Sequence, residues 1–168
     1  MTRKRLAAIA GIFVTAVFIL VLAGVPAAGG SEPPAPITAE PLTGRAHFAD
    51  TTRMRIKVLR DGTREVVRIR HPSRTVTVRF VVQPGAQFPW HSHRGPVLVN
   101  VVSGEFTYVD EQHCAGIRYP AGTAFFDLGK GHVHTAFNSG DEPTVLVSTF
   151  FRAPTEGDLF IPAEPTCP

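Results

Sequence analysis

Two pairs of histidines in this sequence have a spacing that suits a metal site. His91 and His93 lie in the stretch PGAQFPWHSHRGP. His132 and His134 lie in GHVHTAFN. Residues two apart on extended backbone project to the same side, and imidazole is a common ligand of Zn, Mn, Cu, Fe and Ni. If both segments are strands of one barrel, histidines from each can converge on a single ion.

The elements that must position these histidines are short strands. Period-two alternation, as in RMRIKVL, and short apolar runs between turn residues predict strands at 53–59, 64–70, 75–82, 97–103, 105–109, 116–120, 123–127, 132–137 and 144–151. The breaks between them carry Gly, Pro, Asn and Asp. After the N-terminal segment no stretch shows a sustained helical period. This pattern predicts an all-β sandwich or barrel.

The N-terminal segment has the form of a secretory signal. Basic TRKR is followed by a nearly unbroken apolar run over residues 6–25 and then by VPAAGG, which predicts a signal peptide at 1–27 with cleavage after Ala27. A run of ~20 apolar residues is also long enough to span a bilayer. An uncleaved N-terminal helix acting as a membrane anchor is therefore the alternative. In both cases the domain is expected to be secreted or to face the cell envelope, and to meet the membrane only through this segment.

The net charge comes mostly from the same segment. Without Arg3, Lys4 and Arg5 the 17 basic residues become 14, which balance the 14 acidic ones, so no nucleic-acid partner is expected. Residues 45–79 still carry ten basic and three acidic residues. We interpret that stripe as a solvated face of the first strands. Binding of an anionic envelope polymer is the alternative.

The remaining chain divides into a linker, a barrel and a tail. Residues 28–46 are Pro-rich and are expected to form a flexible linker. The strands place the barrel at 47–152, and residues 153–168 are expected to form an extended Pro-rich tail. In an oxidising compartment Cys114 and Cys167 predict one disulfide, which could pin the tail and contribute ~4 kcal/mol in the chain-entropy model. Two free thiols are the alternative.

The histidine stretch resembles the first motif of the cupin superfamily, G(X)5HXH(X)3,4E(X)6G. Gly85, His91, His93 and Gly104 stand at the motif's spacings, and Val97 stands where the motif has its glutamate.

The second cupin motif, G(X)5PXG(X)2H(X)3N, is matched in two parts. PAG at 120–122 matches the PXG core, and His134 to Asn138 match H(X)3N. Eleven residues separate the parts instead of two, so the sequence needs an insertion around FFDLGKGHV. The resemblance covers roughly residues 47–152.

The resemblance implies a double-stranded β-helix, or jelly-roll, barrel that holds a divalent metal through His91, His93 and His134. Without the glutamate, three neutral imidazoles would leave the ion its +2 charge, which favours a small anionic or enolic ligand. His132 is a candidate to replace a ligand, to donate an outer hydrogen bond or to carry a proton. Asp127 is a candidate for orienting a histidine, and Asp127 and His132 are the candidates for a general base if the site is catalytic.

Three functions fit these residues. The first is a metal-dependent enzyme, with dioxygenation of a small phenol, enol or acid as the leading chemistry and isomerisation or hydrolysis as alternatives. The second is a non-catalytic module of the cell envelope that binds a small ligand or a metal. The third is a structural domain without metal. Whether the protein is an enzyme is left open, and pairing of two barrels into a homodimer is a further expectation from the resemblance.

Overall fold

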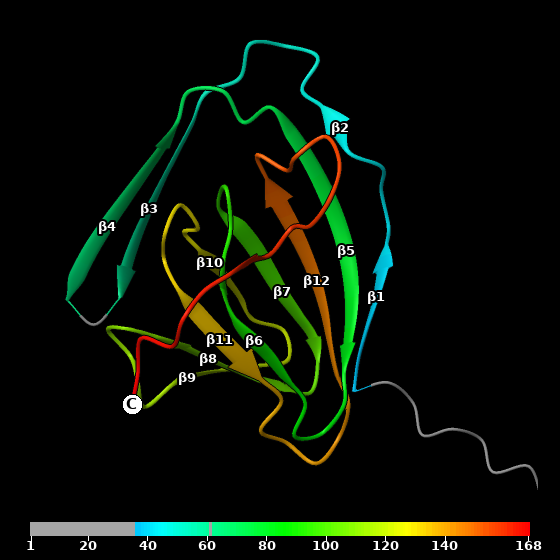
Figure 1. Cartoon of the computed structure of the whole chain (residues 1–168), viewed down its shortest axis with the longest axis vertical. Coiled ribbons are helices and arrows are strands. Elements are labelled where there is room, and N and C mark those ends of the chain that lie inside the picture. The colour runs from blue at the N-terminus through cyan, green and yellow to red at the C-terminus, as the bar shows by residue number, and fades with distance from the viewer. Residues whose placement is uncertain (1–35, 61) are drawn as a thin grey trace, which may run out of the picture. The chain divides into compact units, whose positions relative to one another are not determined.

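Figure 1 shows the computed structural model, which describes residues 36–60 and 62–168. All of its elements are strands: β1 (Ile37–Pro41), β2 (Ala46–His47), β3 (Met54–Arg60), β4 (Thr63–Ile69), β5 (Arg74–Val82), β6 (Gln87–Ser92), β7 (Val97–Ser103), β8 (Glu105–Asp110), β9 (Ile117–Pro120), β10 (Ala124–Asp127), β11 (His134–Phe137), β12 (Thr144–Phe151) and β13 (Ile161–Pro162). Within the described residues there is no helix with the length and apolarity to cross a membrane. The expected signal peptide or anchor at 1–27 lies outside them.

Two antiparallel sheets form the barrel. One has the order β1-β5-β12-β7-β10, with β2 also paired to β5, and the other has the order β13-β6-β11-β8-β9. Buried residues alternate with partly exposed residues along both β5 and β12. The buried face of β5, which carries Val76, Val78 and Phe80, belongs to one core cluster with Phe106 and Tyr108 of the opposite sheet. The predicted all-β fold is confirmed, and the sheets are consistent with a jelly roll.

Strand β1 lies where a flexible linker was expected. It pairs with β5 from Ile37 opposite Val82 to Pro41 opposite Val78, so residues 37–41 of the expected linker 28–46 are part of the barrel. Prolines are compatible with this place because an edge strand leaves every second N–H group free of the ladder. Residues 28–35 lie outside the described part of the chain.

The hairpin of β3 and β4 is a separate two-stranded sheet. It was expected within the barrel at 47–152, but it pairs with neither barrel sheet. Ile56 and Ile69 of the hairpin pack with Leu128 in a small core of their own, against Phe126 and Phe151 of the barrel. Among the described residues, the hairpin contacts the barrel through side chains, and no backbone hydrogen bond joins the two.

The C-terminal segment, residues 153–168, runs back over the barrel (Figure 1, red). Its strand β13 pairs with β6 at Ser92 and His91, and Leu159 and Phe160 pack against the main core. Beyond β13, Cys167 forms the predicted disulfide with Cys114, with an S–S distance of 2.04 Å. The expected extended tail is therefore fastened to the barrel at two places.

Candidate metal centre

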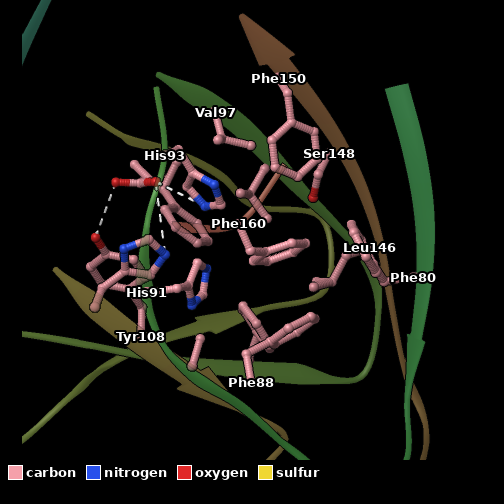
Figure 2. A pocket seen from close by; sticks show the side chains of 16 residues that line it. Phe80, Phe88, His91, His93, Val97, Tyr108, Leu146, Ser148, Phe150 and Phe160 are labelled. Atoms are coloured by element: carbon pink, nitrogen blue, oxygen red, sulfur yellow. Dashed lines mark hydrogen bonds and ion pairs between the residues drawn. The ribbon is translucent and has the colours of Figure 1, made fainter. Parts of the chain in front are cut away.

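Three of the predicted histidines meet inside the barrel. His91 is in β6, His93 follows that strand, and His134 begins β11 directly opposite His91 in the strand pairing. Each of these residues is at most 5% exposed. One ring nitrogen of each lies within 4.8 Å of the others. Figure 2 shows His91 and His93 pointing into the same cavity.

Backbone carbonyls fix the orientation of all three rings. The Nδ1 atoms lie 2.6 Å from Pro89 O for His91, 2.8 Å from Leu159 O for His93, and 3.4 Å from His132 O for His134. A carbonyl only accepts, so each Nδ1 is the protonated, donating nitrogen, and in a neutral ring the tautomer is the Nδ1–H form. Nε2 then carries the lone pair, which is the arrangement that metal-binding histidines have in proteins.

Asp127 completes the cluster from the other sheet. This last residue of β10 is 2% exposed. Its Oδ1 accepts from the N–H of Gly129 at 3.0 Å and from the hydroxyl of Tyr108 at 3.4 Å. Its Oδ2 lies 3.5 Å from His93 Nε2 and 3.8 Å from His134 Nε2, and it has no hydrogen-bond donor among the described residues. A buried polar atom without a partner costs at least roughly 1–3 kcal/mol, so this oxygen fits a site that receives a cation.

Burial favours the neutral, metal-binding form of His91 and His93. Desolvation, assisted by the neighbouring His134 and His93, lowers the pKa of His91 from 6.5 to about 3. Desolvation also lowers the pKa of His93, although the Asp127 carboxylate opposes it. Burial, together with the charge of Asp127, raises the pKa of Tyr108, so its phenol stays protonated and can donate to Asp127. Metal ions therefore meet little competition from protons at His91 near neutral pH.

Around the cluster lies a small cavity with mostly apolar walls. Its volume of about 50 Å³ is room for a few water molecules. Besides the histidines and Asp127, its polar lining among the described residues consists of the hydroxyls of Tyr108 and Ser148, and no lysine or arginine lines it. Its other walls are Phe80, Phe88, Val97, Val99, Phe106, Phe125, Ala136, Leu146, Phe150 and Phe160.

Phe160 of the C-terminal segment covers this cavity (Figure 2). Its ring centroid is 4.6 Å from that of His91 and 5.2 Å from that of His93, and it stacks on Phe88. The sequence reasoning missed Phe160 and Leu159, although their apolar side chains interrupt an otherwise polar, Pro-rich segment. That interruption was the available signal.

His132 lies apart from the other three histidines. Its Nε2 is 3.3 Å from Glu65 Oε2 in β4, and about a third of its side chain is exposed. The two-residue spacing aligns side chains only on extended backbone, and β11 begins at His134. Before it, Gly129, Lys130 and Gly131 have positive φ, so His132 belongs to a turn and faces the hairpin.

The glycine at position 129 allows the loops that carry the site to touch. A side chain at Gly129, where φ is +56°, would place its Cβ 2.0 Å from Gly95 O. The N–H of Lys130 donates to His93 O at 2.7 Å. This close approach of residues 128–133 to residues 93–96 brings Asp127 next to His93.

Asn138, the last residue of the second motif, stabilises the fold through hydrogen bonds. Its Nδ2 donates to Val82 O at 3.0 Å and to Glu142 O at 2.8 Å, and its Oδ1 accepts from Gly140 N. It is 1% exposed and ties the end of β5 to the turn before β12.

Fold and site together define a small β-barrel with a candidate metal centre in its interior. Residues 78–150 match the family model of the cupin domain. Residues 78–150 are therefore a cupin domain, as the two motifs predicted.

Several solved structures are similar to this chain. The Cupin_2 domain of an XRE family transcriptional regulator from Enterobacter cloacae is 15% identical, with a TM-score of 0.46 over 71% of this chain and 99% of that one. KdgF from Halomonas sp. is 19% identical, with a TM-score of 0.45 over 70% and 81%. The polyketide cyclase RemF from Streptomyces resistomycificus is 18% identical, with a TM-score of 0.45 over 54% and 61%.

These likenesses do not bear on function, because all their TM-scores are below 0.5. The match spans 61% of the cyclase, and 51% and 53% of two sugar phosphate isomerases from Acidithiobacillus ferrooxidans and Silicibacter pomeroyi. A comparison with curated proteins gave no match.

Proposed function

We propose that this protein is an extracytoplasmic cupin that binds one divalent transition metal through His91, His93 and His134 and uses it to hold a small molecule. The observation that carries the proposal is the orientation of the rings. Each Nδ1 is placed against a carbonyl, so three Nε2 lone pairs are left inside a buried cavity. Zn, Mn, Cu, Fe and Ni all accept imidazole, and by affinity alone copper and zinc would bind most tightly.

The walls of the cavity define the ligand class. A metal ion there would supply a Lewis acid with open positions for a ligand oxygen. The protein's own residues exclude water with aromatic and aliphatic walls, while Ser148 and Tyr108 offer hydroxyls for orientation. No basic side chain among the described residues lines the cavity, so a phosphate or a second carboxylate would lack a partner. These walls favour a small, largely apolar phenol, enol or acid with one ionisable oxygen, and a ring-sized ligand would need more room than the present cavity of about 50 Å³.

Dioxygenation of such a molecule is the reaction to test first. The alternative is a non-catalytic envelope module that binds the same ligand without turnover. One observation favours the alternative: among the described residues that line the cavity, Asp127 is the only carboxylate, and its Oδ1 is already engaged by Gly129 and Tyr108. The cavity therefore offers few side chains that could act as a general acid or base.

The test is metal content, measured by mass spectrometry on protein purified without a metal-binding tag. We expect about one metal ion per chain in the wild type, and its loss in His91→Ala, His93→Ala and His134→Ala while circular dichroism shows a folded barrel. His132→Ala is the matched control. It removes an imidazole two residues from His134 but keeps the carbonyl that orients His134, so it should retain the metal.

Absence of metal from the wild type, even after reconstitution with zinc, manganese, iron and copper near neutral pH, would refute the metalloprotein proposal. With metal bound, oxygen uptake on small phenols, enols and acids decides between the two functions. Uptake that requires the metal supports the enzyme. Ligand binding without any turnover supports the module.

A further inference from the structure

We infer that Asp127 is a fourth metal ligand, which supplies from β10 the carboxylate that the cupin motif places at the position of Val97. The inference rests on the proposed metal site and changes its composition from three histidines to three histidines and an aspartate.

The strand register places Asp127 opposite the missing glutamate. In the antiparallel pairing of β10 with β7, Asp127 is the direct partner of Val97. Directly paired residues point to the same face of a sheet, with Cβ atoms about 5 Å apart. Both side chains line the same cavity and are 2% exposed. A carboxylate at 127 can therefore reach the point that a glutamate at 97 would reach, from the neighbouring strand.

The distances from Oδ2 to two of the three histidines are close to those of atoms that share an ion. Ligand atoms held at about 2.1 Å from one metal ion are about 3.4 Å apart at tetrahedral angles and about 3.0 Å apart at the right angles of an octahedron, which leaves further positions open for a ligand. Oδ2 lies 3.5 Å from His93 Nε2 and 3.8 Å from His134 Nε2. A direct hydrogen bond would be about 2.7–3.2 Å long, and in the neutral Nδ1–H tautomer Nε2 has no proton to donate. Lone pairs on all three atoms face one another, and a cation between them removes the repulsion.

Asp127 cannot be an outer partner of these histidines. An outer carboxylate accepts from the ring nitrogen that does not bind the metal. Here the Nδ1 atoms already face the carbonyls of Pro89, Leu159 and His132, and Asp127 lies on the Nε2 side. Its own outer partners are Gly129 N–H and the Tyr108 hydroxyl, which both hold Oδ1 and leave Oδ2 free.

This ligand set alters the charge of the site. A divalent ion bound by three neutral imidazoles keeps its +2 charge, whereas coordination by Asp127 reduces it to +1. A ligand with a single ionised oxygen then makes the whole site neutral, which is the favourable state in an apolar cavity without basic residues. The inference therefore specifies a monoanionic ligand.

The experiment compares metal affinity in Asp127→Asn with a rescue at the motif position. Zinc dissociation constants are measured by competition with a chelator, and the cobalt-loaded proteins are compared by visible absorption, which reports the number and geometry of ligands. Asp127→Asn should weaken zinc binding by more than about 100-fold, the upper end of what loss of an outer partner costs, and should change the cobalt spectrum. Val97→Glu added to Asp127→Asn should restore most of the affinity, and Val97→Gln added in the same way should not.

The outcomes separate this inference from the proposed function. A wild type that binds no metal refutes the metal site itself. A wild type that binds metal while Asp127→Asn binds it within about threefold, with an unchanged cobalt spectrum, overturns the aspartate ligand alone. If the variants do not fold, anomalous diffraction from zinc-loaded wild-type crystals decides. A distance of about 2.0–2.2 Å between the metal and Oδ2 supports the inference, and one beyond about 3 Å overturns it.

Discussion

At the scale of single residues, the buried histidines link the stability of the metal-free protein to pH. The pKa of His91 is lowered from 6.5 to about 3 by burial and by the facing His134 and His93. Between these pH values the unfolded chain binds a proton that the folded chain does not, so the free energy of unfolding decreases as pH falls. One such group contributes up to about 1.4 kcal/mol per pH unit.

Urea denaturation in chelator at pH 7.0, 6.0, 5.0 and 4.0 measures this dependence. The reference is His91→Gln, which lacks the imidazole and so reports the pH dependence of all the other groups. We expect the wild type to lose stability more steeply than His91→Gln as pH falls below 6.5. Equal slopes for the two proteins would show that His91 is protonated as readily in the fold as in the unfolded chain.

The sequence predicted the histidines of the site but not the whole site. His91, His93 and His134 are recognisable because their spacing is local and matches a known motif. The proposed role of Asp127 as a metal ligand depends on its pairing with Val97 in the sheet. Strand pairing is a feature of the tertiary structure, and a local sequence pattern does not predict it. His132 illustrates the reverse case, because its spacing from His134 is local but the backbone before β11 is not extended.

At the scale of elements, the bounds of strands with a clear apolar alternation were predicted closely. Strands that are extended only because they pair with a neighbouring strand were missed. The predicted 75–82 and 144–151 correspond to β5 and β12 within one residue. Strand β6, QFPWHS, has no apolar alternation and contains a proline, and it is extended because β11 and β13 flank it. Strand β1 is likewise extended because it pairs with β5. The intrinsic strand propensity of a segment does not predict such pairing.

The disulfide and the C-terminal segment are predicted to support the metal site together. Replacing both Cys114 and Cys167 by serine removes the crosslink across 53 residues, which should cost about 2–4 kcal/mol of unfolding free energy. The carbonyl of Leu159, which orients His93, lies in the segment that the disulfide fastens. We therefore expect zinc affinity to fall by about tenfold, as for loss of an outer partner.

Denaturation and chelator competition on the same double-serine preparation test both effects. Unchanged zinc affinity in a destabilised protein would show that β13 and the packing of Phe160 hold Leu159 in place without the crosslink. The double variant Cys114→Ala with Cys167→Ala is the control. It also removes the disulfide but introduces no hydroxyl groups, so it excludes an effect of the serine hydroxyls.

At the scale of the whole molecule, the candidate site exists only when both sheets and the C-terminal segment are in place. Asp127 comes from the sheet that contains β10, His91 and His134 come from the sheet that contains β6 and β11, and the C-terminal segment adds Leu159 and Phe160. A bound ion would therefore join parts that are far apart in the sequence. This explains why the fold class was easier to predict than the composition of the site.

The last prediction concerns the compartment in which this assembly forms. We propose that the chain is exported and cleaved after Ala27, and the disulfide between Cys114 and Cys167 supports this because such crosslinks persist in oxidising compartments. Intact mass of the protein recovered outside the cytoplasm should correspond to residues 28–168 with the two cysteines oxidised. Protein found in the membrane fraction with residues 1–27 retained would establish the anchor instead.

Residues 28–168 expressed in a reducing cytoplasm should carry free thiols and, on the reasoning given for the double-serine protein, should unfold at lower urea concentration. Recovery of the full-length, reduced chain from the cytoplasm of the native host would contradict export in both forms.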